Sequence, residues 1–303
     1  MTSFAYLPRR AALSSFVNVR GLRLHVLRWG EAAADAVPLV MMHGWMDVAA
    51  SFQFVVDAFA HARPVIAFDW RGFGRSDAGG GDGYWFPDYL ADLDALLDAP
   101  ELGLAGRSVD LLGHSMGGNV AMLYAGVRPL RVRRLVNLEG FGMPRSTPEQ
   151  APRRYAQWLD QLREPARLKP YDSLDAVAAR LRETNPLLPA DKAAWLATHW
   201  AAPDGDGRWA LRADPAHKHV NPVLYRVDEV LACWRHIVAP LLWVEGDRTD
   251  MSRWWGHRYP RDEFEARLGV VANVERCRLS PAGHMLHHDQ PEALAARLEA
   301  FLD

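Results

Sequence analysis

Short apolar runs alternate along the chain with segments of helical periodicity. Before the runs begin, residues 16–30 alternate apolar and polar positions around Gly21, which predicts a β-hairpin with one buried face. Strands of a sheet are predicted at 37–42, 65–68, 109–112, 135–138, 241–244 and 274–279. Helices are predicted among them at 49–59, 87–97, 119–127 and 291–302. This order is typical of βαβ units, whose parallel strands bring their carboxyl ends, and any ligand, to one edge of the sheet.

The strand pattern disappears between Phe141 and Ile237. Proline-rich turns there separate helical segments near 150–163, 173–184, 189–200 and 222–235. We expect a helical cap at 141–236, inserted between two core segments at 1–140 and 237–303. Cap and core would form an apolar pocket between them, so some cap tryptophans should face it. The cap tryptophans are Trp158, Trp195, Trp200, Trp209 and Trp234.

The stretch from Val109 to Gly118 predicts a strand, a sharp turn and a helix. The apolar strand stops at Gly113, and the helix follows Gly117 and Gly118, which leaves Ser115 at the apex. This is the Gly-x-Ser-x-Gly nucleophile elbow, in which the serine takes a strained backbone conformation and the flanking glycines leave room for the turn. The hydroxyl would stand at a helix N-terminus, where free N–H groups favour developing negative charge.

Four motifs along the chain resemble those of the α/β-hydrolase fold. They are His43-Gly44-Trp45, residues 69–77, the elbow at 113–118 and Gly283-His284. The chain is similar to capped members of that family, of the serine-hydrolase-like and epoxide-hydrolase-like kinds. The resemblance implies an α/β fold with a mostly parallel eight-stranded sheet flanked by helices and a cap between strands 6 and 7. It also implies a catalytic triad in the chain order Ser, acid, His.

Ser115 is the expected nucleophile and His284 the expected base. A free hydroxyl is a poor nucleophile near neutral pH and needs a base within hydrogen-bond reach. His284 follows the last predicted strand in a Pro-Ala-Gly-His turn. His287 and His288 lack the preceding glycine, so we expect them to start the last helix or to line the pocket. His114 is expected to have a packing role.

Three carboxylates compete for the role of triad acid, which fixes the imidazole tautomer and stabilises the imidazolium. Relatives usually place the acid after the strand that follows the cap, often three residues past a glycine. Counting from Gly246 gives Thr249, so we rank Asp250, one residue on, first. Some relatives take the acid from the strand before the cap, where Glu139 stands; it ranks second. Asp247, which also fits a simple turn residue, ranks third.

An oxyanion hole needs two backbone N–H groups aimed at the developing alkoxide. The residue after the nucleophile, Met116, is expected to supply one. The resemblance implies that Trp45, which follows His43-Gly44, supplies the other.

Composition narrows the range of partners. The chain of 303 residues has 49% hydrophobic and 24% charged residues and a net charge of -2, which gives no argument for nucleic acid. No apolar run reaches membrane-spanning length and no signal peptide is recognised at the N-terminus, so we expect a cytoplasmic protein. No metal is expected, because no His/Asp cluster has ligand spacing and Cys233 and Cys277 lie far apart. No Gly-x-Gly-x-x-Gly opens a first βα unit, so no cofactor is expected.

These features favour a serine hydrolase that cleaves a small apolar carboxylic ester or related acyl substrate through an acyl-enzyme. Two other functions remain open: hydrolysis of a carbon–carbon bond by the same triad, and non-catalytic binding of a small ligand. Dehalogenase and epoxide-hydrolase chemistry would need a carboxylate at the elbow, where this chain has Ser115.

Overall fold

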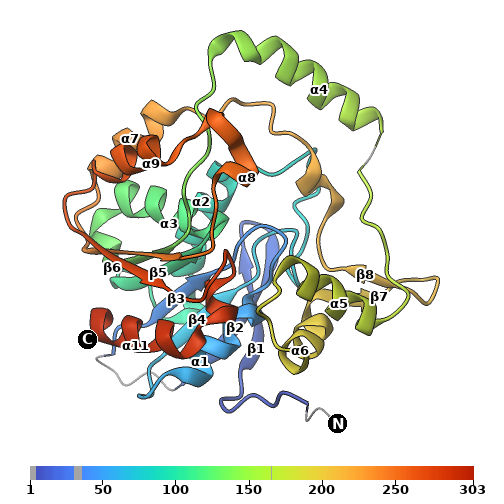
Figure 1. Ribbon diagram of the computed structural model, residues 1–303, viewed down its shortest axis with the longest axis vertical. Coiled ribbons are helices and arrows are strands. Elements are labelled where there is room, and N and C mark those ends of the chain that lie inside the picture. Colours follow the sequence, from blue (N-terminus) through green and yellow to red (C-terminus); the bar gives the residue numbers. More distant parts are fainter. Residues whose placement is uncertain (1–4, 31–35, 165) are drawn as a thin grey trace.

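The computed structural model describes residues 5–30, 36–164 and 166–303, and an eight-stranded sheet lies at its centre (Figure 1). Its strands are β1 (Leu13–Val19), β2 (Leu22–Trp29), β3 (Leu39–Met42), β4 (Val65–Phe68), β5 (Val109–His114), β6 (Val132–Leu138), β9 (Leu241–Gly246) and β10 (Val274–Leu279). They lie in the order β1-β2-β4-β3-β5-β6-β9-β10. β2 pairs antiparallel with both β1 and β4, and every other pair is parallel. The carboxyl ends of β3 to β10 therefore meet at one edge, as predicted.

Helices cover both faces of the sheet, because successive residues of its buried strands point to opposite sides. In β5, Leu111 packs in the core on one face and Leu112 in the core on the other. The first face is covered by α2 (Phe86–Leu97), α3 (Met116–Val127) and α7 (Val227–Arg235), and the second by α1 (Gln53–Ala58) and α11 (Pro291–Leu302). The eight-stranded, mostly parallel fold predicted from the sequence is confirmed.

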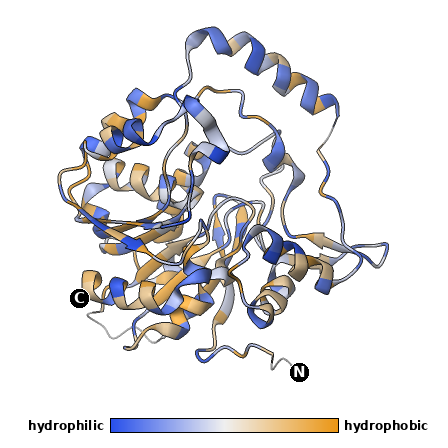
Figure 2. Cartoon of the chain, viewed as in Figure 1, coloured by the Kyte–Doolittle hydropathy of each residue, from blue (hydrophilic) through white to orange (hydrophobic). Residues whose placement is uncertain are grey.

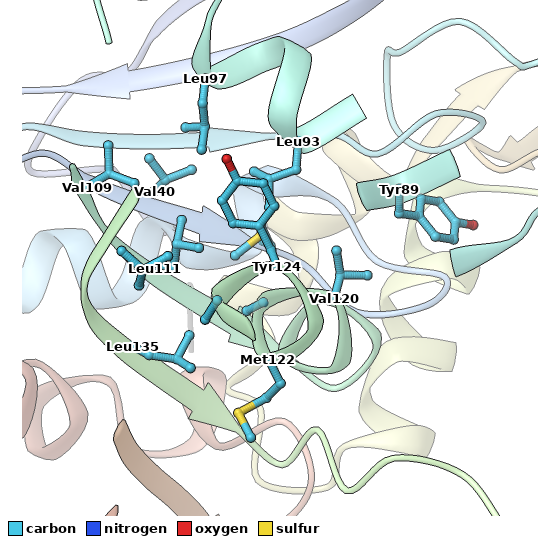
Figure 3. Packing of buried hydrophobic residues seen from close by; sticks show 14 of the residues in the cluster. Val40, Tyr89, Leu93, Leu97, Val109, Leu111, Val120, Met122, Tyr124 and Leu135 are labelled. Carbon is cyan, nitrogen blue, oxygen red and sulfur yellow. The ribbon is translucent and has the colours of Figure 1, made fainter. Parts of the chain in front are cut away.

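Helix α3 is the helix that starts at the serine elbow, and it is anchored deep in the core. Figure 3 shows Val120 and Tyr124 of α3 directed among side chains of the sheet and of α2, including Leu111 and Leu93, with Met122 on another side of the helix. All five side chains are buried. The N-terminus of α3 is therefore fixed against the sheet edge by packing along the whole helix.

The chain leaves the sheet between β6 and β9. Helices α5 and α6 pack on each other and form a small separate core that includes Phe54. Helix α4 has no buried residue; it stands apart from the sheet in Figure 1 and is largely hydrophilic in Figure 2. The elements of this insertion are α4 (Ala151–Arg163), α5 (Leu174–Thr184), α6 (Ala190–Trp200), the antiparallel pair β7 (Ala201–Pro203) and β8 (Trp209–Leu211), and the 3-10 helix η5 (Pro215–Lys218).

One helix expected in the cap belongs to the core. The helix predicted at 222–235 begins only at Val227, as α7, and packs against α3. The two helices approach so closely that a Cβ on Gly126 would overlap the carbonyl group of Cys233. Trp234 is buried in the same core as α3. The expected boundary at 236 is therefore wrong for this helix, and we propose a cap that spans 141–226.

Shorter elements complete the described chain. No helix among residues 5–30, 36–164 and 166–303 is long and apolar enough to cross a bilayer. The remaining helices are η1 (Ala49–Phe52), η2 (Pro100–Leu102), η3 (Pro129–Arg131), η4 (Pro148–Gln150), α8 (Ser252–Trp255), η6 (Gly256–Arg258), α9 (Arg261–Leu268) and α10 (Leu286–Asp289).

Candidate active site

Ser115 stands between β5 and α3 in a backbone conformation that residues other than glycine rarely adopt. Its φ is 51° and its ψ is -113°. Such strain persists only where the surroundings enforce it, and here the contacts are close. A Cβ on Gly113 would overlap the carbonyl of Gly117, and a Cβ on Gly117 would overlap the carbonyl of Met42. The strand, turn and helix predicted from the sequence are present.

His284 is paired with Glu139, the carboxylate ranked second from the sequence. The imidazole Nδ1 lies 2.7 Å from Glu139 Oε2. Because a carboxylate accepts, Nδ1 carries the proton and Nε2 is left as an acceptor. Glu139 follows β6 directly, has a φ of 55° and has a fully buried side chain. This arrangement gives His284 the tautomer that a general base needs.

Two further groups, at the end of β9 and just after it, donate to the Glu139 carboxylate. The backbone N–H of Gly246 donates to Oε1 at 2.6 Å, and the Thr249 hydroxyl donates to Oε2 at 3.0 Å. β6 and β9 are paired neighbours, so the residues that follow them meet at the sheet edge. Thr249 stands where the family pattern expects the acid, and in this chain its hydroxyl donates to a carboxylate that follows the adjacent strand.

Asp250 and Asp247 face other partners. Asp250, ranked first from the sequence, accepts the N–H of Ser252 at 2.9 Å, as a turn residue before a helix does, and its side chain is 51% exposed. Asp247 accepts the N–H of Ala282 at 2.9 Å and the hydroxyl of Ser280 at 2.6 Å. The geometry therefore favours Glu139 over Asp250, which ranks first from the sequence, as the partner of His284: Asp250 is held in a local turn, and Asp247 fixes the loop that precedes His284.

Ser115, Glu139 and His284 line one cavity of about 700 Å³ at the carboxyl edge of the sheet. Within the described part of the chain, no hydrogen bond joins the Ser115 hydroxyl to His284. Such bonds are often long before substrate binds and tighten in the complex. The remaining wall is largely aromatic, and the Trp254 ring packs 4.6 Å from the His284 ring, centroid to centroid.

The tryptophans of this cavity come from segments other than the expected ones. Trp195, Trp200 and Trp209 pack around the small α5–α6 core, and Trp234 lies in the main core. None of these four, nor Trp158, is among the lining residues; the tryptophans that do line the cavity are Trp45, Trp85, Trp254 and Trp255. The expectation that cap tryptophans face the cleft is wrong. Periodicity shows that a tryptophan is buried but gives no information on which core buries it.

Two backbone N–H groups are available beside Ser115. Met116 is the first residue of α3, so its N–H has no acceptor within the helix. Trp45 N–H likewise has no hydrogen-bond acceptor among the described residues, and both residues line the cavity. Gly44 allows this approach, because a Cβ there would lie 2.9 Å from His114 Nδ1 and 3.3 Å from Ser115 Cβ. Both positions fit the donors expected for an oxyanion hole.

His114 and His287 form a buried polar group behind the elbow. His114 Nε2 donates to the carbonyl of His284 at 2.8 Å, and burial lowers the pKa of His114 well below its usual value. Asp47, His114 and His287 are all buried, and one potential metal-ligand atom from each lies within 4.8 Å of the others. Sequence spacing could not show this grouping, because its members come from three separate segments. The expectation that His287 and His288 start the last helix or line the pocket is wrong: both are buried in the short helix α10, which precedes α11, and neither lines the cavity.

The fold agrees with what comparison with known proteins finds. Residues 37–291 match the family model described as alpha/beta hydrolase fold. The chain belongs to the α/β-hydrolase fold family. The α/β-hydrolase from Pseudomonas putida named N-formylmaleamate deformylase is 29% identical over 294 residues, which are 95% of each chain.

One further relative and one solved structure are also similar to this α/β-hydrolase over most of its length. A serine hydrolase-like protein from Danio rerio is 26% identical and covers 77% of this chain and 72% of its own. Among solved structures, a thioesterase domain from the curacin biosynthetic pathway superposes with a TM-score of 0.80 at 24% identity, over 95% of this chain and 99% of that one. At that identity the thioesterase supports the fold alone. The relatives together support a hydrolase.

Sequence reasoning missed three contributors to the site of this α/β-hydrolase: Thr249, Trp254 and the bond from His114 to the His284 carbonyl. Thr249 could have been found, since a hydroxyl residue stands where the family pattern expects an acid. The other two depend on which loops meet in space, and no local pattern carries that information.

Proposed function

We propose that this α/β-hydrolase is a serine hydrolase that cleaves a carboxylic ester or a related acyl substrate through an acyl-enzyme. The observation that carries the proposal is the 2.7 Å bond between His284 Nδ1 and Glu139 Oε2, in the same cavity as the strained Ser115. Ser115 is the nucleophile, His284 the base and Glu139 the acid. The largely apolar cavity supports a substrate with an apolar portion.

In the first half of the reaction, Ser115 Oγ attacks the acyl carbon and its proton passes to His284 Nε2. The bond to the leaving group then breaks, and the leaving group takes that proton. The buried Glu139 carboxylate stabilises the imidazolium between these transfers. The N–H groups of Trp45 and Met116 stabilise the oxyanion, and each such donor contributes about 3 kcal/mol in well-studied cases.

In the second half, His284 Nε2 removes a proton from water, which attacks the acyl carbon; the bond from this carbon to Ser115 Oγ then breaks, His284 returns the proton to Oγ, and a free acid is released. A formyl group is itself an acyl group, so the name of the deformylase relative is in line with this chemistry. Thioesters and activated amides are included among the related acyl substrates.

The test is labelling with a fluorophosphonate, followed by turnover of short p-nitrophenyl esters. Wild-type protein is expected to take one label, detected by intact mass, and to hydrolyse the esters. Ser115→Ala should abolish labelling and reduce turnover by about 10³-fold or more. Ser108→Ala is the matched control, because Ser108 is an exposed serine at the opposite end of the same strand.

The outcomes separate the alternatives. Folded wild-type protein that neither takes the label nor hydrolyses any ester would overturn the proposal. Labelling without turnover of esters, combined with turnover of a vinylogous diketone, would instead establish a carbon–carbon hydrolase. Absence of label, together with binding of an apolar ligand, would establish a non-catalytic binder.

A further inference from the structure

Among the charged side chains that line the cavity, positive ones outnumber negative ones. They are Glu139, Arg154 and Lys218. The Glu139 carboxylate accepts hydrogen bonds from His284, Gly246 and Thr249, so it is not available to pair with Arg154 or Lys218. His217 also lines the cavity, but burial lowers its pKa to about 3, so it is neutral near pH 7. The wall therefore presents two positive charges without a carboxylate of the cavity to balance them.

Arg154 lies on the inner side of α4. It is half-buried, whereas its neighbour Arg153 is exposed. Ion pairs on either side of it in sequence join Arg145 to Asp228 and Arg163 to Asp160. Within the described residues, by contrast, no carboxylate lies within 4.0 Å of Arg154. A guanidinium turned into a largely aromatic cavity without a partner is available to an anion that the ligand brings.

Lys218 approaches the same cavity from the end of η5. Its Nζ donates to the carbonyl of Arg167 at 3.0 Å, which orients the ammonium and leaves two of its three N–H groups unused. The segment that carries Lys218 is also bonded to α4, because Val220 N–H donates to Gln161 Oε1 at 2.7 Å. This bond joins the segments that carry the two cations, which therefore lie on the cap side of the cavity, whereas Ser115 lies at the sheet edge.

We propose that the acyl substrate carries an anion, a carboxylate or a phosphate, at the end remote from the scissile bond, and that Arg154 and Lys218 bind this anion. The inference rests on the proposed function and specifies its substrate class. The apolar wall between the two ends, which includes Trp85, Phe86 and Tyr225, would take the intervening carbon chain. A substrate that is apolar throughout would leave the half-buried Arg154 guanidinium facing hydrocarbon without a partner, which is unfavourable, whereas the exposed Lys218 ammonium stays in water.

The test compares pairs of p-nitrophenyl esters of equal chain length, from five to ten carbons. One member of each pair ends in a free carboxylate and the other in its methyl ester; a third series ends in a phosphate. The measured quantity is the ratio of kcat/KM for the anionic ester to that for the neutral ester. At the best length this ratio should exceed unity in wild-type protein and should fall as salt is raised.

Arg154→Gln and Lys218→Gln are each expected to reduce this ratio by about five- to tenfold while leaving turnover of the neutral ester within about twofold. Arg154→Lys should retain part of the preference. Arg153→Gln is the matched control and should leave the ratio unchanged. The carboxylate and phosphate series then show which anion is preferred.

Failure of this inference is distinct from failure of the proposed function. Turnover of the neutral esters with a wild-type ratio near one, or a ratio that Arg154→Gln does not change, would overturn the anion site and keep the serine hydrolase. If no ester is hydrolysed, calorimetry with the corresponding free dicarboxylates decides: binding that Arg154→Gln weakens supports the anion site, and absence of binding overturns it.

Discussion

The carboxylate of Glu139 is buried, and three hydrogen-bond donors contact it. It accepts hydrogen bonds from Gly246 N–H, the Thr249 hydroxyl and His284 Nδ1. A buried carboxylate without such partners would be strongly disfavoured as an anion. The three bonds orient one oxygen toward the backbone and the other toward the imidazole. At the scale of a single residue, this environment is what distinguishes Glu139 from the exposed Asp250.

The first prediction concerns these two carboxylates. Glu139→Gln should lower kcat/KM for a p-nitrophenyl ester by about 10³- to 10⁴-fold, because the amide no longer selects the tautomer that leaves Nε2 free. Asp250→Asn should keep activity within about threefold, since its contacts are local to the turn before α8. Steady-state kinetics checks both variants, with circular dichroism to verify folding. A larger loss in Asp250→Asn than in Glu139→Gln would contradict the assignment.

Ser115 and His284 could be singled out from the sequence because each lies inside a local motif at a strand end. The carboxylate that pairs with His284 could not be singled out in the same way. Glu139 and Asp250 follow two strands that are neighbours in the sheet but lie more than 100 residues apart, so both candidates reach the same edge. Side-chain direction decides between them, and it depends on the positive φ of Glu139 and on the turn that captures Asp250.

At the scale of elements, α3 enters the fold at a distance from β3 that only glycine permits. An added Cβ on Gly117 would overlap the Met42 carbonyl and lie 2.7 Å from the carbonyl oxygen of His43. Backbone atoms cannot move aside as a flexible side chain can. The close approach brings the first N–H groups of α3 beside the segment that carries Trp45, so one contact sets both the packing of the helix and the expected oxyanion donors.

Gly117→Ala is therefore expected to lower the free energy of unfolding by about 1–3 kcal/mol, as overpacking does in well-packed cores. Urea unfolding followed by tryptophan fluorescence measures the change. Gly83→Ala serves as the control, because Gly83 is exposed and a Cβ there would have no neighbour within 4 Å. Equal stabilities of Gly117→Ala and wild-type protein would show that the elbow adjusts more freely than its contacts indicate.

Most helices and strands could be predicted from the sequence, but whether a helix belongs to the cap or to the core could not. Apolar runs and helical periodicity located the sheet strands and α1, α2 and α11 within a few residues. They could not show that α7 packs on α3 instead of joining the cap, because an amphipathic helix has the same pattern over either surface. The short pair β7–β8 escaped notice, since three-residue strands carry almost no periodic signal.

At the scale of the whole molecule, burial has left several histidines neutral. Desolvation lowers the pKa of each of them, in the case of His217 to about 3. Because their pKa values are lowered on folding, the unfolded chain binds protons at these residues more readily than the folded protein does, so the free energy of unfolding should decrease as pH falls below about 6.5. Asp110 and Asp289, whose pKa values burial raises, oppose this trend only at lower pH. The histidines are His43, His114, His199, His217 and His288.

We therefore expect His217→Phe to flatten the pH dependence of stability, by about 1.4 kcal/mol per pH unit at most between pH 6 and 5. The phenylalanine keeps the stacking, since the His217 ring lies between Phe73 and Tyr84 at centroid distances of 3.7 and 3.6 Å. Urea unfolding at pH 7.5, 6.5 and 5.5 gives the slope. His61→Phe is the control, because the His61 side chain is 80% exposed. An unchanged slope in His217→Phe would contradict the prediction.

Because the proposed acid, Glu139, follows β6, the segment after β9 can vary in sequence without loss of a proposed catalytic group. Beyond Thr249, this segment supplies Trp254 and Trp255 to the cavity wall and none of the proposed catalytic groups. In evolutionary terms, this part of the surface that selects substrates is therefore encoded apart from the proposed catalytic residues. A library that varies residues 250–258 in sequence and length should change which acyl chains are accepted while sparing the chemistry, so new specificities are best sought there first.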